Sequence, residues 1–390
     1  MRIVIAFGSL FALAALEIAA PATVMAQQAA KETARTARPA VARSATPWEV
    51  QRERLNQNTV TIITGTPAGT YLAVGYDMSV VMDDGDNLRV LAVTGKGSVQ
   101  NVKDILHLRG VDMGIVQSDV MSHFKASGEY GQNFDQRLLY IAKLYNEEMH
   151  LVVNSKIKDI KELAGQKVSF AEVGSGTQFS SRLIFGGLGV KVDEVNFGLN
   201  DALLKVKTGE IAGLVWIGGR PSPALAKLTK DPDLKLLPVP YTAALEDSSY
   251  LPATLSGQDY PALLGETEKI DTVAVGAVLA VYNWAKDSDR YRRVAKFTDT
   301  LFARFPELQK TPRHPKWKEV NLAAKLKGWN RFAPAQTWLD SQASQTATAA
   351  ATEASVVRKQ AAQAAPGDKT EQERLFQQFL EWKRQQPVAR

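Results

Sequence analysis

The sequence has no cysteine and only four histidines among its 390 residues. Without cysteine the chain can form no disulfide bond, no thiolate metal site and no cysteine-linked lipid anchor. The histidines are not spaced like metal ligands, and neither H-E-x-x-H nor G-x-S-x-G occurs. These absences argue against a metalloenzyme or a serine hydrolase. We therefore expect a protein that is not an enzyme and that uses no cofactor and no bound metal.

Long apolar runs are also missing, except at the start of the chain. Residues 1–26 contain Arg2, an apolar stretch over 3–20 and small residues at 24–26, which is typical of a signal peptide. A membrane anchor is the competing interpretation, but the stretch is short and carries Glu17. No later segment reaches the roughly 18 apolar residues that a membrane helix requires. Export of a chain without disulfides favours the periplasm of a Gram-negative bacterium.

Excess charge is scarce in the central part of the chain. The formal net charge is +6, but residues 27–54 contribute +3 and residues 341–390 contribute +2, which leaves +1 for residues 55–340. A nucleic-acid-binding surface needs a concentration of basic residues. The central part lacks one, so we expect no nucleic acid partner.

From residue 59 onward, segments typical of strands alternate with segments typical of helices, which predicts parallel sheets with crossover helices. One such unit covers 60–124 and a second covers 157–237. The β-rich run 270–282 has no partner nearby, so we expect it to return to the first lobe and complete a two-strand hinge. The predicted fold is α/β, the type II periplasmic binding-protein fold, with two α/β lobes and a C-terminal helical tail. The predicted divisions are a signal peptide at 1–26, a disordered lead-in at 27–58, lobe 1 at 59–150 and 255–340, lobe 2 at 151–254, an Ala/Gln-rich linker at 341–369 and an amphipathic helix at 370–390.

Two glycine-containing turns each lead from a strand into a helix. The first runs from the strand 60–63 through Gly65 and the loop 66–70, and the second is the Gly-Ser-Gly-Thr turn at 174–177. Backbone N–H groups in the first turn of a helix have no partner within the helix, and they favour a negatively charged group by roughly 0.3–1 kcal/mol. One such turn in each lobe predicts two lobes that close on one small ligand.

Several short motifs follow one another along the chain: the loop 66–70, the segments 97–102, 113–119, 144–147, 150–153, 174–177 and 201–213, and the turn 216–221. In this order they resemble the TAXI group of TRAP-transporter solute receptors over about residues 59–340. The resemblance implies a periplasmic receptor that binds a small organic anion, glutamate-like or a dicarboxylate, and delivers it to a sodium-coupled TRAP membrane permease. The chain departs from the family pattern at Pro67, which removes one backbone N–H, and at Arg220, which stands where small residues are common.

The predicted ligand-binding residues combine this resemblance with positions at helix starts and strand ends. Several have plainer interpretations: the hydroxyl residues at helix starts are also good caps, Tyr145 suits hinge packing, Trp216 suits the core and Arg220 suits a solvated surface. Asp119 would repel an anion, so we expect it to cap its helix or to hold an ammonium group of the ligand. Lys96 is interpreted as a surface charge. The predicted residues are Thr66, Gly69, Thr70, Ser98, Asn101, Gln117, Ser118, Tyr145, Glu147, Ser175, Gly176, Thr177, Gln178, Trp216 and Arg220.

The C-terminal segment suggests a second function. Thr370 and Glu373 have the spacing of a capping box, and the apolar residues from Leu375 to Trp382 share one face of a helix. This helix either docks on the body, which we prefer, or binds a partner. The alternative function is therefore a periplasmic sensor that presents its bound ligand to a membrane signalling protein. In either case we expect a monomer.

Overall fold

The computed structural model describes residues 44–246 and 249–385. The predicted signal peptide and the lead-in up to residue 43 lie outside the described residues. The chain divides into two units, residues 1–52 and 53–390. Helix α2 (Pro47–Asn58) occupies part of the predicted disordered lead-in. A capping box at its start explains this difference, because the backbone N–H of Thr46 donates to Glu49 (2.7 Å) and that of Glu49 donates to Thr46 Oγ1 (3.3 Å).

The first lobe begins with a β-α-β-α-β unit. Strand β1 (Thr59–Ile63) pairs in parallel with β2 (Arg89–Val93) and with β3 (Met113–Gln117). Helix α3 (Thr70–Met82) connects β1 to β2, and α4 (Ser98–His107) connects β2 to β3. The lobe also contains α5 (Ser118–Ser127), α6 (Phe134–Arg137), α11 (Asp289–Ala303), α12 (Phe305–Leu308) and the 3-10 helix η2 (Pro315–Glu319).

The second lobe repeats this plan. Strand β5 (Lys167–Ser169) pairs in parallel with β6 (Asp193–Val195) and with β7 (Gly213–Gly218). Helix α7 (Gly176–Gly187) connects β5 to β6, and α8 (Leu199–Lys207) connects β6 to β7. The remaining elements are η1 (Ile160–Leu163), α9 (Pro223–Ala226), β8 (Leu234–Leu237), α10 (Ala243–Glu246) and β9 (Leu251–Ser256).

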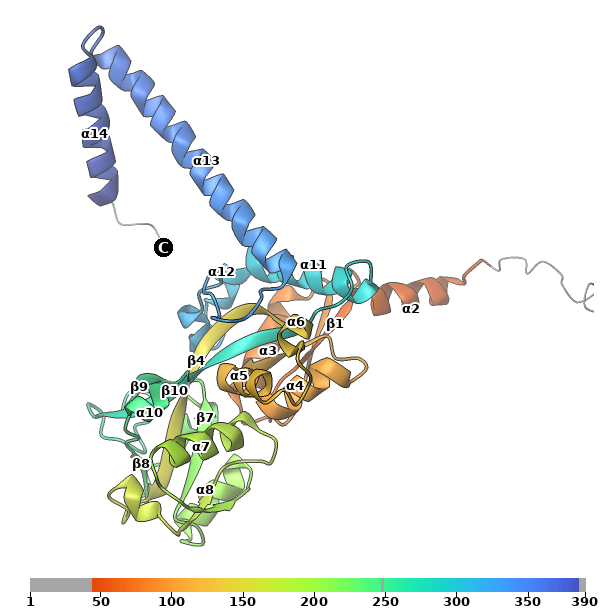
Figure 1. The fold of residues 1–390 in the computed structure, drawn as a ribbon, viewed down its shortest axis with the longest axis vertical. Coiled ribbons are helices and arrows are strands. Elements are labelled where there is room, and N and C mark those ends of the chain that lie inside the picture. The colour runs from red at the N-terminus through yellow and green to blue at the C-terminus, as the bar shows by residue number, and fades with distance from the viewer. Residues whose placement is uncertain (1–43, 247–248, 386–390) are drawn as a thin grey trace, which may run out of the picture. The chain divides into compact units, whose positions relative to one another are not determined.

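Two long antiparallel strands, β4 (Leu138–Asn154) and β10 (Lys269–Tyr282), run through both lobes (Figure 1). In the first lobe β10 pairs with β3, whereas in the second lobe β4 pairs with β7 and β8, and β10 pairs with β9. The ten strands of the described residues therefore form one sheet in the order β2-β1-β3-β10-β4-β7-β5-β6, with β8 and β9 off this path. This arrangement is the predicted two-strand hinge of a two-lobe α/β fold.

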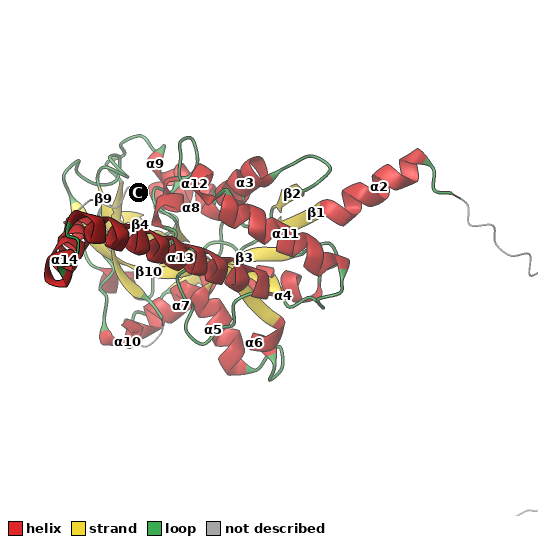
Figure 2. Ribbon diagram, turned by 90° about the horizontal axis from the view of Figure 1, so that it is seen from above, coloured by secondary structure: helices red, strands yellow, loops and turns green. Residues whose placement is uncertain are grey.

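Helices cover both faces of the sheet (Figure 2). In the first lobe Met113 and Ile115 of β3 pack with α3 and α11, while Val116 packs with α4 and α5. Because successive side chains of a strand point to opposite faces, a strand covered on both sides is apolar throughout. Residues 255–275 pack in the cores of the second lobe, whereas the sequence placed them in lobe 1 from 255 onward. The reason is that β9 pairs with the first half of β10, so the chain returns within β10 rather than before it.

Two helices follow the lobes. Helix α13 (Ala333–Ala364) covers most of the predicted linker, and α14 (Lys369–Gln385) follows after a short turn (Figure 1). Alanine has the highest helix propensity, and the hydroxyl groups of α13 donate to carbonyls of their own helix, as Thr348 does to Ser344 (2.9 Å). The segment is therefore helical without a core of its own. Asp368 rather than Thr370 caps α14, since its Oδ1 accepts the N–H of Glu371 (3.0 Å).

Candidate functional site

A cavity between the lobes lies at the carboxyl ends of strands from both of them. The cavity itself has a volume of about 40 Å³, and the space around it that holds no protein atoms, open solvent included, is about 400 Å³. Helices α3 and α4 of the first lobe and α7 of the second begin at its wall, so their first N–H groups lie at one site. The predicted residues that line it are Thr66, Gly69, Thr70, Ser98, Gln117, Glu147, Ser175, Gly176, Thr177 and Trp216. Gly65, Tyr71, Lys96, Gly97, Glu172 and Ile217 complete the lining.

The starts of α4 and α7 face each other across the lobe boundary. A Cβ atom placed on Gly97 would lie 3.5 Å from the backbone nitrogen of Gly176. The N–H of Gln100 in α4 donates to the carbonyl of Gly174 in the other lobe (3.1 Å). On another side of the cavity, Thr70 Oγ1 donates to the carbonyl of Gly219 (3.2 Å). The two lobes are therefore closed on each other around the cavity.

Glu147 is a buried carboxylate in the cavity wall, with only 2% of its surface exposed. Tyr71 donates its hydroxyl hydrogen to Glu147 Oε2 (2.7 Å). Ser98 Oγ in turn lies 3.0 Å from the Tyr71 oxygen and accepts the N–H of Gln117 (3.0 Å). Burial, together with the negative charges of Asp119 and Glu148, raises the pKa of Glu147 to about 8.

Asp119 does not line the cavity but joins the lobes behind it. It lies on α5 of the first lobe and accepts hydrogen bonds from Ser180 (2.6 Å) and Tyr250 (2.7 Å) of the second. Its Oδ1 also accepts the N–H of Val120 (2.7 Å), in the manner of a helix cap. Burial raises the pKa of Asp119. Of the two roles expected for Asp119, the geometry matches the cap.

Trp216 lies within β7, before its last residue Gly218, and its indole N–H has no hydrogen-bond partner among the described residues, although the side chain is only 6% exposed. The backbone of Trp216 is held from the other side. Its carbonyl lies 3.2 Å from His150 Nδ1, and His150 Nε2 lies 2.7 Å from the hydroxyl of Tyr260, which itself accepts the N–H of Ser222 (2.7 Å). A buried donor in the wall of an open cavity is a candidate ligand contact.

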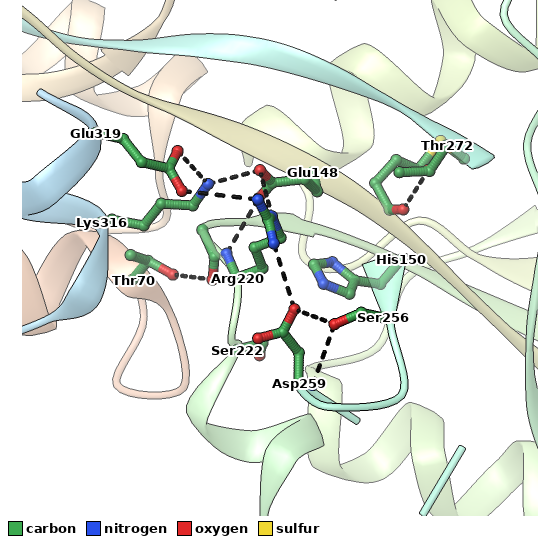
Figure 3. Close-up of polar contacts among 12 residues, drawn as sticks. Thr70, Glu148, His150, Arg220, Ser222, Ser256, Asp259, Thr272, Lys316 and Glu319 are labelled. Carbon is green, nitrogen blue, oxygen red and sulfur yellow. Dashed lines mark hydrogen bonds and ion pairs between the residues drawn. The ribbon is translucent and has the colours of Figure 1, made fainter. Parts of the chain in front are cut away.

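Arg220 is the main difference from the sequence-based site. It does not line the cavity but lies among carboxylates (Figure 3). Its Nε is 3.3 Å from Glu148, its Nη1 is 3.4 Å from Asp259 and its Nη2 is 3.9 Å from Glu319 of the first lobe. Lys316, which is fully buried, shares Glu148 (2.6 Å) and Glu319 (2.7 Å) with it. These nearer protein carboxylates occupy the guanidinium that the sequence had assigned to the ligand.

Four other predicted residues also lie outside the lining. The amide of Asn101 donates to the carbonyls of Thr64 (2.8 Å) and Ile115 (2.7 Å), so it holds β1 to β3. Gln178 accepts from the N–H of Gly174 (2.9 Å) and closes the turn before α7. Ser118 and Tyr145 are buried beside the lining without belonging to it.

Six lining residues are absent from the predicted set, and two of them, Tyr71 and Lys96, carry side chains that can bind an anion. Tyr71 directly follows Thr70 in the first turn of α3, so its position could have been predicted from the motif. Lys96 is exposed, as expected of a surface charge, yet it also lines the cavity. No pattern in the local sequence separates these two roles of a lysine.

Across 44–246 and 249–385, no group of three or more His, Asp or Glu side chains could hold a metal ion. Within the same ranges, no helix combines the length and the apolar character needed to span a membrane. What the cavity provides is a set of N–H donors from three helix starts, an unpaired indole N–H and a buried carboxylate.

The model of one protein family, described as NMT1-like, matches residues 62–334. The chain belongs to the NMT1-like family. The matched range spans both lobes and ends at the start of α13, so the two C-terminal helices lie outside it. The NMT1-like family is of the periplasmic binding-protein type, and its members bind substrates rather than transform them. Membership confirms the predictions of a solute-binding protein and of a protein that is not an enzyme.

Solved structures of similar proteins are distant. AbpA from Streptococcus pneumoniae, an amino acid ABC transporter substrate-binding protein bound to L-arginine, is 13% identical, with 70% of this chain and 100% of that chain covered and a TM-score of 0.37. The alkanesulfonate-binding protein SsuA from Xanthomonas axonopodis pv. citri, bound to MOPS, is 13% identical over 65% of this chain and 74% of that chain, with a TM-score of 0.39. A mutant of ArgBP from T. maritima is 13% identical over 69% of this chain and 95% of that chain, also with a TM-score of 0.39. At these scores the likenesses carry no argument about the ligand of this chain.

Proposed function

We propose that this protein is a periplasmic solute receptor that binds a small organic anion, glutamate-like or a dicarboxylate, in the cavity between its lobes. The observation that supports this most is the meeting of three helix starts, two from one lobe and one from the other, at a single cavity. Helix starts attract negative charge, and donors from both lobes give an anion more contacts in the closed form than in the open one. The indole N–H of Trp216 adds a further donor.

The experiment is a melting curve of the purified protein with a panel of dicarboxylates and amino acids. A ligand that binds only the folded state raises the melting temperature by mass action. Substitution Lys96→Gln removes the cation at the cavity and is expected to weaken binding of the best anion. Lys103→Gln changes an exposed lysine on α4 away from the lining and is the matched control. A panel that leaves the melting curve unmoved would contradict the proposal.

The partner that we propose is a TRAP-type membrane permease, to which the protein delivers its ligand as a monomer. Support comes from the motif resemblance to the TAXI group and from the binding-protein family. Cells that lack the receptor should lose uptake of the radiolabelled ligand, and the full-length gene should restore it. Uptake that survives deletion of the receptor but not of an ABC permease would contradict the assignment to TRAP.

A sensor remains the second candidate, favoured by one observation. The family match ends at residue 334, so most of α13 and all of α14 lie beyond the part of the chain that matches the family. Removal of residues 341–390 should then abolish binding to a membrane signalling protein and leave ligand affinity unchanged. If the truncated protein still restores uptake of the ligand and still binds the same proteins as the full chain, the result favours the transport receptor.

A further inference from the structure

We propose that the ligand carries a cationic group that binds Glu147, opposite an anionic group that binds the helix starts. The ligand class is then a small amino acid rather than a dicarboxylate. This inference rests on the proposed function, because it concerns the same cavity and asks which anion that cavity selects.

The first argument is a contrast between neighbouring carboxylates. Glu148 is almost fully buried and is neutralised twice, by Lys316 (2.6 Å) and by Arg220 (3.3 Å). Glu147 is equally buried but forms no ion pair with any described residue. Buried carboxylates are costly unless paired, so an unpaired one is unusual. Since Glu147 lines the cavity, a ligand can supply the missing cation.

The second argument is the hydrogen-bonding capacity of Glu147. A carboxylate accepts about four hydrogen bonds. Glu147 accepts one hydrogen bond from Tyr71 (2.7 Å), and a side-chain hydrogen bond with Gln117 acts to lower its pKa. Both partners are neutral, and they leave room for further donors on the cavity side. An ammonium group has three hydrogens to donate and no acceptor, which makes it complementary to this carboxylate.

The third argument is the distribution of charge around the cavity. The helix starts, the indole of Trp216 and Lys96 favour a negative group. Glu147, whose pKa is about 8, becomes negative when it gives up its proton to a cation that binds beside it, and the half-buried Glu172 is a second acid in the same lining. A dicarboxylate would bring one of its charges toward these acids, whereas an amino acid presents a charge of the correct sign to each side.

Matched ligands test this directly. Calorimetric titration of the full-length protein with glutamate and with glutarate compares two molecules that differ only in the amino group, and aspartate with succinate forms a second pair. We expect each amino acid to bind at least about tenfold more tightly than its partner, as for a hydrogen-bonded buried charge pair. Equal binding of both members, or tighter binding of the dicarboxylates, overturns the inference while it supports the proposed function. If no anion binds at all, the proposed function itself fails.

Two further measurements address Glu147 itself. Glu147→Gln keeps the shape of the side chain, and we expect it to weaken amino acid binding by at least about tenfold while dicarboxylate binding is retained or improved. Glu266→Gln, at an exposed position away from the cavity, should change neither. If Glu147 instead stays protonated and donates to the ligand, Glu147→Gln binds amino acids as tightly as the parent protein does, which overturns the inference.

Calorimetric titration at pH 7 in buffers of different ionisation enthalpy measures the number of protons released on binding. Binding of a cation to a protonated Glu147 must release a proton. The titrating and charged groups around Glu147 are Tyr71, Asp119, Tyr145, Glu148 and Lys96.

Discussion

Gly176 of the second lobe approaches Gln117 of the first so closely that a methyl group on Gly176 would overlap the side-chain oxygen of Gln117. The same methyl group would lie 2.7 Å from Ser98 Oγ. Gly176 has an ordinary helical backbone, so its requirement for glycine comes from the other lobe and not from its own conformation. Closure of the two lobes around the cavity therefore depends on the absence of one side chain.

Substitution Gly176→Ala should hold the lobes apart. We expect ligand affinity to fall by a factor of ten or more, while the melting temperature without ligand changes little, because each lobe keeps its own core. Gly186→Ala is the matched control on the same helix, since a methyl group there would meet nothing within 4 Å. Calorimetric titration and small-angle scattering with and without ligand check this. A compact Gly176→Ala protein with normal affinity would contradict it.

Lys316 should contribute strongly to stability through its buried ion pair with Glu148. Loss of one partner of a buried pair costs about 3–5 kcal/mol, and we expect the lower end of this range because Arg220 still lies 3.3 Å from the buried Glu148. We expect Lys316→Met to lose stability on that scale in urea unfolding, and Glu148→Gln in the same chain to recover part of the loss. Lys205→Met breaks an exposed ion pair with Glu210 of the same 2.6 Å length and should cost no more than about 1 kcal/mol. Equal losses in the two lysine variants would show that burial is not the cause.

The pKa of Glu147 predicts a dependence of stability on pH. Between pH 4.5 and about 8 the folded protein binds more protons at Glu147 than the unfolded chain does, so the free energy of unfolding falls as pH rises. His150 has the opposite effect on the free energy of unfolding. Burial lowers its pKa from 6.5 to about 4, so between these two pH values the unfolded chain binds more protons at His150 than the folded protein does. Both proteins contain His150, so its contribution cancels when the free energy of unfolding of the parent protein is subtracted from that of Glu147→Gln. We expect that difference to favour the variant increasingly from pH 5 to pH 8, and a constant difference would contradict the assignment.

The C-terminal helices should be dispensable for folding of the lobes. The first turns of α13 belong to the body, where Ala335 is fully buried and Trp338 contacts Phe302 with ring centroids 5.2 Å apart. Beyond Asp340, α13 packs mainly on α14, as in the contact of Arg358 with the ring of Phe376 (4.1 Å). A chain that ends at Asp340 should therefore keep its ligand affinity, with a melting temperature within a few degrees of the full chain. A large loss of stability would show that the two helices also support the lobes.

Local patterns in the sequence predicted most of the architecture. The β-branched run before Gly65 and the Gly-Ser-Gly-Thr turn identified two helix starts correctly, because strand, turn and helix each depend on nearby residues. The same reasoning treated the alanine-rich segment after Asp340 as a linker, although its composition favours a helix on propensity alone. Arg220 was assigned to the ligand from its place in the turn 216–221, and its actual partners Asp259 and Glu319 are remote in the sequence.

Glu147 and Glu148 show what could not be predicted from the sequence alone. The sequence placed both residues near the end of a strand, where two successive side chains point to opposite sides. Which of the two meets Lys316 and which meets the cavity depends on how residues from the far end of the chain pack against β4. The sequence thus predicted most of the elements of the lobes and both glycine-containing turns, and it indicated a solute-binding protein. Only the tertiary structure decided which charges are paired, because ion pairs form between neighbours in space whose separation along the chain leaves no local pattern.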